Sequence, residues 1–576
     1  MMLRRTKETE VMNTQMNNAQ LGAERRRRLT SLVFLCLAVL SPAMCYSDQS
    51  SVSQFGITWT FDRDHVVGQF ANGDYWVVGP VKIVEIHPAS VESSGRVING
   101  SMINPSPRFV KRQGYDSAMY GSYAQAGDYE ASLNVARPSG QDLSKDNPLI
   151  VDPNSSLVST ISTPEADGRT QLKTAAILTV LKSAVPKGSF RPPYCGDDKS
   201  VKFYSKKLDY SLLASLTPVP GVPLLPTVER YFERPWLDHV PLWMAGAQHP
   251  VDNMPNYGRE IGTQVGIGAV MLNLNFTNQR KEKLLVRYVQ LGIDLYGIVQ
   301  DGGRRNWVGM GGHANGRKFP ILFAGFVLGD PEMMSIGKKS GDYLYSEGYG
   351  PGNEPPDYIH FGEDDQTFYV AQLDVDATHS LEWKPDHRDT QNIPYETEDI
   401  GLPEWGIVHA IAPEQSNKFW DTAYRNVSSP CWGGIALAAH IMGMKEAWNH
   451  NAFFDYVDRY MRTATERRQT DRFVETMWDT YRSDYYGPVW TVAPTLTIEA
   501  VNGWVAMVPD KEVYTQGDRV RLRAVADAGY RFSDWSGDLT GDDNPTAIVM
   551  RSSRTITANF AAVSEAPDPD YVKPSN

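Results

Sequence analysis

The chain has 576 residues, of which 41% are hydrophobic and 22% charged, and its formal net charge is −12 at pH 7. This length is too great for one hydrophobic core, so we expect roughly two to four domains. The acidic balance disfavours nucleic acid and anionic membrane surfaces as partners.

The first 46 residues have the pattern of a secretory signal peptide. A basic block at 25–28 precedes an apolar run at 29–43 that ends near small residues. The run is too short for a membrane anchor, so we expect export to the periplasm, the cell surface or the medium, without membrane insertion. The segment carries seven basic and three acidic side chains, which leaves the rest of the chain at −16. Beyond it lie only Cys195 and Cys431, and whether they pair stays open.

Residues 50–204 are predicted to form a β-sandwich-like domain. Short apolar or alternating runs bounded by Pro, Gly, Asn and Asp are typical of strands. Residues 72–74, Asn-Gly-Asp, indicate a hairpin turn between the first two runs. The predicted strands cover 57–61, 75–78, 81–86, 149–151, 156–161 and 175–181.

Residues 205–490 are predicted to be helical, after a Pro-rich stretch at 218–226. Apolar residues recur there at helical spacing and no strands are expected between the helices. Paired helices joined by long loops indicate an α/α toroid, complete or incomplete. The predicted helices cover 257–274, 281–300, 318–328, 331–345, 433–448 and 451–466.

The chain becomes strand-rich again at 495–562. Predicted strands fall at 497–500, 520–524, 532–537, 547–550 and 555–560. This segment resembles the bacterial InlB-type B-repeat module through Gly517-Asp518 and the runs AGYRF at 528–532, WSGD at 535–538 and ANF at 558–560. The resemblance implies a small β-grasp-like accessory unit of a secreted or surface protein, without chemistry of its own. The Pro-rich, acidic tail at 563–576 is expected to be disordered.

The stretch 301–318, DGGRRNWVGMGGHANGRK, holds most of the candidate site residues. Its six glycines allow the backbone to approach a ligand closely, and its cations can pair with a substrate carboxylate. If 313–317 belongs to the helix that follows, His313 and Arg317 share one face. The competing interpretation is a loop with solvated surface charges. Candidates here are His313, Asn315 and Arg317 for catalysis, and Arg304, Arg305 and Trp307 for substrate binding.

Two further constellations stand at predicted helix starts. Asn256, Tyr257 and Arg259 open one helix, where the backbone dipole favours an anion, although a plain Asn cap explains them equally well. A Tyr beside an Arg can serve as general acid or base if its pKa is lowered. Tyr424 and Arg425 precede another helix start and are expected to face the same cavity.

A fourth candidate group is acidic: Glu363-Asp364-Asp365 suits a helix start, a solvated turn or a glycosidase carboxylate. It lacks the ligand spacing of a metal site. The chain contains no nucleophile elbow, zinc-protease motif, P-loop or dinucleotide fingerprint, so we expect no metal and no cofactor.

Taken together, the leader, the β-domain, the helical region and its aromatic-rich loops resemble secreted polysaccharide lyases of the α/α-toroid type, over 205–490. The resemblance implies β-elimination on a uronic-acid polymer such as alginate or glucuronan. Asn, His or Arg would neutralise the C5 carboxylate, and Tyr or His would move the proton, with His313, Asn315, Arg317, Tyr257 and Tyr424 as candidates. A β-domain placed first departs from the usual toroid-first order.

Two alternatives remain open. An inverting glycoside hydrolase would use Glu363 or Asp364 with Glu404 or Asp421. A non-catalytic surface protein would bind carbohydrate through its β-domain and its B-repeat-like module. The sequence does not define the polymer, the endo or exo mode, the oligomeric state, or whether the three constellations meet in space.

Overall fold

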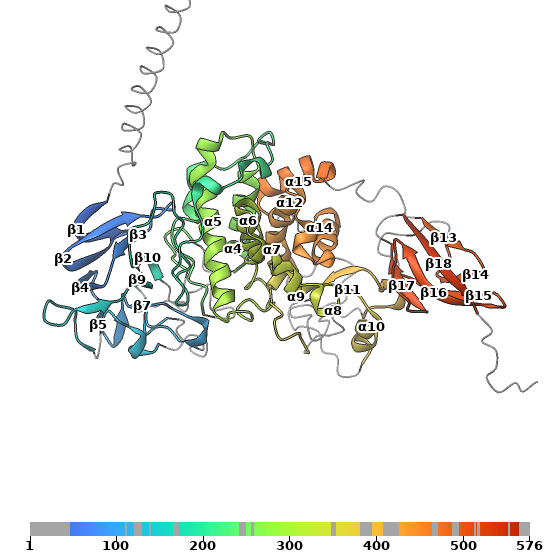
Figure 1. Ribbon diagram of the computed structural model, residues 1–576, viewed down its shortest axis with the longest axis horizontal. Coiled ribbons are helices and arrows are strands. Elements are labelled where there is room, and N and C mark those ends of the chain that lie inside the picture. The colour runs from blue at the N-terminus through green and yellow to red at the C-terminus, as the bar shows by residue number, and fades with distance from the viewer. Residues whose placement is uncertain are drawn as a thin grey trace, which may run out of the picture.

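The computed structural model describes residues 46–563 except 110–111, 120–128, 138–139, 165–171, 241–248, 255–257, 347–352, 381–393, 407–424, 464–469, 486–494, 512–513, 515–518 and 551–552. The predicted signal peptide, apart from Tyr46, and the predicted disordered tail beyond 563 lie outside this range. Figure 1 shows a strand-rich part, a helical middle and a small C-terminal sheet module following one another along the long axis of the molecule.

The N-terminal strands form one eight-stranded sheet rather than the two separate sheets of a sandwich. Its order is β7-β9-β10-β3-β2-β4-β8, and β1 pairs with β2. The predicted hairpin is present, because β2 and β3 pair antiparallel on either side of 70–74. The strands are β1 (Ser47–Gln54), β2 (Ile57–Gln69), β3 (Tyr75–Val78), β4 (Val81–His87), β7 (Ser101–Ile103), β8 (Leu149–Val151), β9 (Ser155–Ser162) and β10 (Leu172–Leu181), with a separate pair β5 (Val91–Ser93) and β6 (Arg96–Ile98).

One hydrophobic core joins this sheet to the helices. Val158 and Ile177 of the sheet belong to the same buried cluster as the helical core. Arg191, 1% exposed, makes a buried ion pair with Asp74 at 2.6 Å and another with Asp294 of α5 at 2.6 Å. The sheet and the helices are therefore held together by apolar packing and by shared buried charge.

The predicted helices appear in the predicted order, but two of them are divided, a strand pair is added, and further helices are present that were not predicted. The predicted helix at 331–345 is divided into α7 (Pro331–Met334), a 3-10 turn and α8 (Tyr343–Ser346). The predicted helix at 433–448 is two helices, because Gly443 adopts φ +66 between them. A strand pair, β11 (Thr367–Tyr369) with β12 (Pro403–Trp405), lies where no strand was expected. The other helices are α2 (Leu225–Tyr231), α4 (Gly258–Leu272), α5 (Asn278–Gln300), α6 (Lys318–Leu328), α9 (Gly362–Gln366), α10 (Gln372–Thr378), α11 (Arg425–Ser428), α12 (Trp432–Ile441), α13 (Lys445–Trp448), α14 (Asn451–Thr463) and α15 (Arg472–Tyr485). Of these, α2, α9, α10, α11 and α15 were not predicted.

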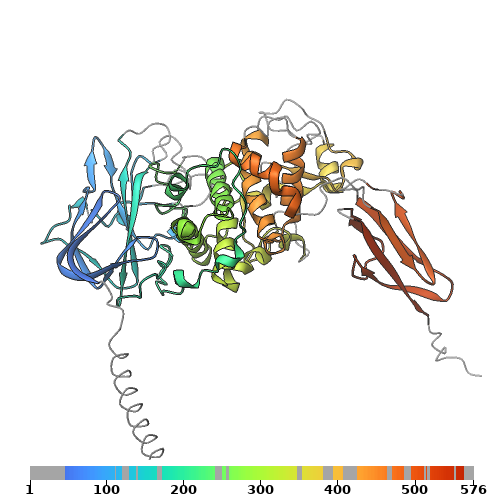
Figure 2. The ribbon, with the colours of Figure 1, turned by 90° about the horizontal axis from the view of Figure 1, so that it is seen from above.

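Close backbone packing of α4 on α12 fixes the centre of this domain. An added Cβ at Gly266 would lie 3.0 Å from the Cα of Gly434, so neither position has room for a larger side chain. Figure 1 shows α5 next to the N-terminal sheet and α12 on the far side of α4 and α6, and in Figure 2 the green helices lie between the sheet and the orange helices. The described helices establish a helical middle domain, and the toroid remains a prediction.

The C-terminal module has its own core between two three-stranded sheets, β13-β18-β16 and β14-β15-β17. All five strands predicted from the sequence are present, and β14 is an additional one. Their bounds are β13 (Leu496–Ala500), β14 (Gly503–Val508), β15 (Arg519–Ala526), β16 (Tyr530–Gly537), β17 (Thr546–Val549) and β18 (Arg554–Ala562).

Two remaining expectations concern the membrane and the thiols. None of the helices in the described part of the chain has the length and apolar character needed to cross a bilayer. Cys195 and Cys431 are both buried and free, so the pairing that the sequence left open is not formed.

Candidate functional site

The three constellations adjoin one another at the end of the helical domain where α4, α6 and α12 begin and α5 ends. At Gly258, an added Cβ would lie 2.0 Å from the carbonyl oxygen of His313, so α4 begins directly against the Gly-rich stretch. The indole nitrogen of Trp432 donates a hydrogen bond to Asn315 Oδ1 at 3.0 Å. We call this region the loop face, comprising 238–239, 249, 258–260, 301–318, 358–366, 404 and 425–432.

Arg317 is completely buried and bound to a carboxylate that the sequence analysis did not identify. Its Nε donates to Asp238 Oδ2 at 2.8 Å and its Nη2 to Asp238 Oδ1 at 3.2 Å. His249 bonds to the same carboxylate through Nε2. Burial opposes ionisation of Asp238, but Arg317 and His249 hold its pKa below the usual value. Arg317 is thus occupied by a protein carboxylate in this structure.

Lys318 has a similar environment. Its Nζ donates to Asp364 Oδ2 at 2.5 Å, with both side chains fully buried, and Trp448 Nε1 donates to Asp364 Oδ1 at 2.7 Å. Burial lowers the pKa of Lys318, while Asp364 opposes that shift. Two of the four cations in the Gly-rich stretch therefore neutralise internal acids instead of facing solvent.

The other two cations of the stretch are exposed. Arg304 donates to the carbonyl oxygen of Pro356, and Arg305 lies 3.5 Å from Glu354. Both side chains are nevertheless exposed to solvent and accessible to an anion. Trp307 is only 1% exposed and stacks on Phe361 at 5.7 Å between ring centroids. A ring packed in this way presents no face for stacking on a sugar.

His313 and Arg317 do not share a helical face, because α6 begins only at Lys318. His313 is half-buried and its carbonyl oxygen accepts from Arg317 Nη1 at 3.4 Å. Asn315 is fully buried and donates from Nδ2 to the carbonyl oxygen of Gly311 at 3.2 Å. These three of the five predicted catalytic residues are neighbours, but Asn315 and Arg317 direct their polar atoms to protein groups.

The remaining candidates divide into paired and undescribed residues. Arg425 is buried and donates to Glu404 at 2.7 Å and to Tyr456 at 3.0 Å, and Arg259 pairs with the adjacent Glu260 at the surface end of α4. Four candidates lie outside the described residues: Asn256, Tyr257, Asp421 and Tyr424.

Glu363 is an acid of the loop face whose pKa is shifted towards neutral pH. It is fully buried, and burial raises its pKa to about 7, with a further contribution from Asp364. Gly316 N donates to Oε2 at 3.3 Å, whereas Oε1 has no hydrogen-bond partner among the described residues. A carboxyl group with this pKa can act as a general acid near neutral pH.

His239 is the corresponding basic group, and the sequence analysis missed it. It is fully buried, burial lowers its pKa to about 3, and Nε2 has no hydrogen-bond partner among the described residues. Its Nδ1 lies 3.4 Å from the Tyr194 hydroxyl, and the rings of Tyr115 and Tyr194 both pack edge-on against the imidazole. A neutral imidazole is the protonation state that a general base requires.

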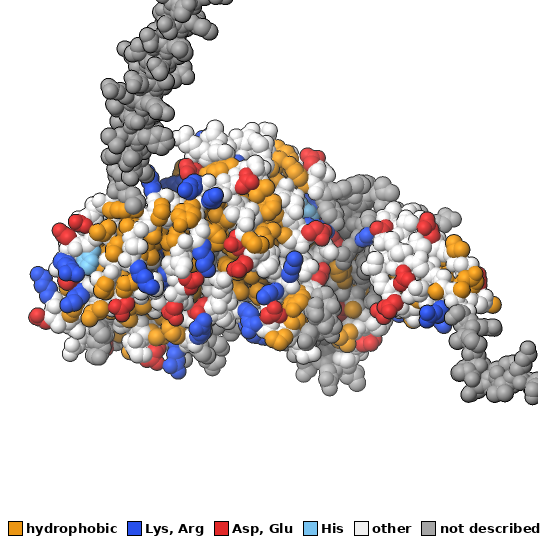
Figure 3. All heavy atoms as spheres, in the orientation of Figure 1, with side chains coloured by type: hydrophobic (Ala, Val, Ile, Leu, Met, Phe, Trp, Pro, Cys, Tyr) orange, Lys and Arg blue, Asp and Glu red, His pale blue; other side chains and the backbone are white. Residues whose placement is uncertain are grey.

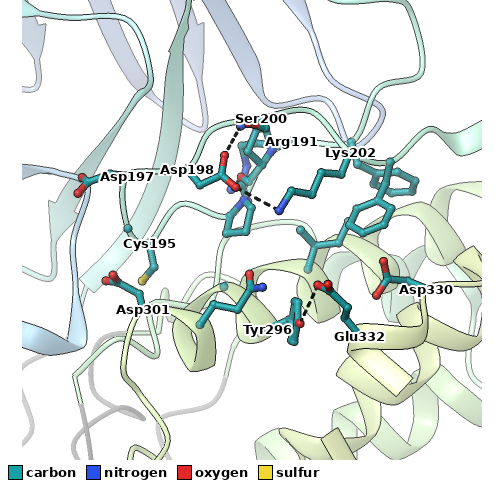
Figure 4. Close-up of a pocket in the computed structure, with 18 of the residues that line it drawn as sticks. Arg191, Cys195, Asp197, Asp198, Ser200, Lys202, Tyr296, Asp301, Asp330 and Glu332 are labelled. Carbon is teal, nitrogen blue, oxygen red and sulfur yellow. Dashed lines mark hydrogen bonds and ion pairs between the residues drawn. The ribbon is translucent and has the colours of Figure 1, made fainter. Parts of the chain in front are cut away.

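A separate cavity of about 290 Å³ lies between the 190–203 segment and α5 (Figure 4). Its labelled carboxylates are Asp197, Asp198, Asp301, Asp330 and Glu332, against the labelled cations Arg191 and Lys202. None of the site residues predicted from the sequence lines it. Its acidic walls would repel a uronate, so we do not place the chemistry there.

Comparison with known proteins identifies only the C-terminal module. The family model of a divergent InlB B-repeat domain matches residues 494–564, and this domain is typically found in surface or secreted proteins. No curated protein and no solved structure matches the chain significantly.

Proposed function

We propose that this protein is a polysaccharide lyase that cleaves a uronic-acid polymer, of alginate or glucuronan type, by β-elimination at the loop face. The observation that carries the proposal is the neutral imidazole of His239, whose Nε2 has no hydrogen-bond partner among the described residues and whose Nδ1 lies 3.4 Å from the hydroxyl of Tyr194. β-Elimination needs a base for the C5 proton and an acid for the leaving oxygen. A neutral His and a protonated Tyr supply these two groups.

In the proposed reaction, His239 Nε2 accepts the C5 proton, and the electron pair forms the C4–C5 double bond as the C4–O bond breaks. Tyr194 donates a proton to the departing glycosidic oxygen. Burial raises the pKa of Tyr194 well above its ordinary value, so it keeps its proton until that step. The exposed cations Arg304 and Arg305 attract the polymer, and the proposal assigns neutralisation of the C5 carboxylate to the half-buried Arg259 at the start of α4.

The proposal assigns Arg317 a positioning role. It holds Asp238, the residue adjacent to His239, through two hydrogen bonds, and Asn306 Nδ2 donates to the carbonyl oxygens of Asp238 and His239 at 2.9 and 3.1 Å. These contacts fix the backbone that carries the base. Because His239 is fully buried, the proposal also requires that substrate binding displaces neighbouring side chains from Nε2.

The test is to incubate the full chain with alginate and glucuronan and to follow the ultraviolet absorbance of the new double bond. His239→Ala should reduce the rate by about 10²–10⁴-fold, the usual contribution of a general base. His379→Ala is the matched control, since His379 is half-exposed next to α10 and pairs with Glu396, away from the loop face. The absence of an absorbance rise on every uronate polymer would count against the proposal.

A second candidate, an inverting glycoside hydrolase, is favoured by the pKa of Glu363, about 7, which suits a general acid. The other predicted carboxylates are less suitable, because Lys318 holds Asp364 and Arg425 holds Glu404, while Asp421 lies outside the described residues. New reducing ends without ultraviolet absorbance, abolished by Glu363→Gln and retained in His239→Ala, would favour the hydrolase. Glycan binding without any product would instead favour the non-catalytic alternative.

We also propose that residues 1–46 direct export and are removed. The basic block and apolar run support this, together with a C-terminal module of a type found in surface or secreted proteins. Determining the N-terminal residue of the exported protein tests the proposal. A mature chain that still begins at Met1 would contradict it.

A further inference from the structure

The C-terminal module has one sheet face that its own core does not use. In the sheet β14-β15-β17, Val505 and Met507 alternate with Trp504, Ala506 and Val508 along β14. The first set packs into the module core, so the second set points to the opposite side. Trp504 is 56% exposed and Val508 66% exposed, so this face carries two large exposed apolar side chains with Ala506 between them.

The central strand of this sheet places two arginines on the same outer face. In the antiparallel register, Ala506 lies opposite Arg523 and Val508 opposite Arg521. Directly paired residues project to the same side, and residues two apart on a strand are separated by about 7 Å. Arg521 and Arg523 are therefore neighbouring cations on this face, with Arg523 diagonal to Trp504 and Arg521 opposite Val508.

In the described part of the chain, the two guanidinium groups have no protein partner. Among the described residues, neither Arg521 nor Arg523 makes an ion pair or a side-chain hydrogen bond, and both are exposed. The exposed Arg531, on the other sheet of the module, likewise has no such partner there. Arg523 lies two residues from Arg521 and diagonal to Trp504, whereas Arg531 lies opposite Ala561 on the other sheet.

The same face continues into a groove of about 620 Å³. On the module side the groove is lined by Val508, Pro509, Lys511 and Arg521, and on the helical side by residues that include Glu398. Lys511 adds a third cation at this edge. This volume falls within the range of roughly 300–1,000 Å³ that is typical of ligand sites.

We propose that the outer face of β14 and β15, formed by Trp504, Arg521 and Arg523, binds an acidic polysaccharide. Sugar rings are amphipathic and stack on an exposed indole, while guanidinium groups pair with carboxylates through two parallel hydrogen bonds. Charge complementarity favours this occupant, because the face carries two exposed cations on a chain whose net charge is −12. The proposal concerns binding alone and does not depend on the lyase reaction.

Affinity electrophoresis of the full-length chain in gels containing polygalacturonate tests the proposal, with dextran as the uncharged polymer. In a His239→Ala background, which prevents cleavage by the proposed lyase, Arg523→Ala and Trp504→Ala should each weaken binding to polygalacturonate by about fivefold to tenfold. Arg531→Ala removes the same charge from the other sheet and should change binding less than about twofold. Dextran should retard none of the variants.

The result that would overturn the proposal is an equal loss of binding in Arg523→Ala and Arg531→Ala, or no loss in either. An unchanged near-ultraviolet circular dichroism spectrum and melting of the module would show that a loss is not caused by misfolding. Because the assay measures binding and not cleavage, failure of this face to bind would not count against the proposed lyase reaction. Conversely, binding can succeed even if no uronate is ever cleaved.

Discussion

Arg317 and Asp238 form a two-point ion pair, at 2.8 and 3.2 Å, with neither side chain exposed to solvent. The pair joins the segment that carries His239 to the start of α6. It therefore determines where the proposed base lies relative to the Gly-rich stretch.

The first prediction follows from this pair. Asp238→Asn should lower the free energy of unfolding by about 3–5 kcal/mol, because it leaves the Arg317 guanidinium buried without a counter-charge. Urea denaturation measures the change. Asp357→Asn provides the matched control: Asp357 pairs with Lys339 at 3.4 Å at the surface, where such pairs contribute about 0–1 kcal/mol. Equal losses in the two variants would contradict the buried-pair interpretation.

The second prediction concerns Glu363 and pH. Its folded-state pKa, about 7, is raised above the ordinary value of 4.5, so the folded protein keeps this proton over a pH range in which the unfolded chain releases it. Its contribution to stability is therefore complete below pH 4.5 and is lost as the pH rises towards 7, by about 3 kcal/mol in total.

Glu363→Gln, which cannot ionise, should remove this pH dependence. Relative to wild type, its free energy of unfolding should increase steadily between about pH 4.5 and 7 and remain constant above that range. Parallel urea titrations at several pH values measure the difference. A constant difference across the whole range would mean that Glu363 titrates normally in the folded protein.

The third prediction concerns the joint between the sheet and the helices. Arg191→Met should destabilise both parts together by about 3–5 kcal/mol, because Asp74 and Asp294 then remain buried without their cation. Since one core spans both parts, calorimetry should show them unfolding in a single transition, with the C-terminal module unfolding separately. Separate transitions for the sheet and the helices would contradict the shared core.

The fourth prediction uses the two thiols. Burial raises the pKa of Cys195 and of Cys431 well above the ordinary value, so both are protonated and shielded from reagents. In a chain lacking residues 1–46, a thiol reagent such as Ellman's should detect no reactive cysteine in the folded protein and two after denaturation. Detection of none after denaturation without reductant would indicate a disulfide instead.

Local patterns predicted most of the elements. Apolar periodicity predicted α5 and α6, and α6 has the same bounds, 318–328, in sequence and structure. The pattern failed where a single glycine decided the outcome: Gly443, with φ +66, ends one helix and separates it from the next. It also missed β11 and β12, whose pairing joins segments far apart in the chain and leaves no periodic signal in so few residues.

The sequence by itself determined the division into a strand-rich part, a helical middle and a B-repeat module, because hydrophobic periodicity and turn residues are local properties. The tertiary structure alone decided what the cations of the Gly-rich stretch do. Arg317 finds its carboxylate 79 residues away and Lys318 finds one 46 residues away, so both basic groups lie inside the core. Desolvation and pairing depend on such distant neighbours, and for the same reason no local pattern identified His239 as the neutral base proposed for catalysis.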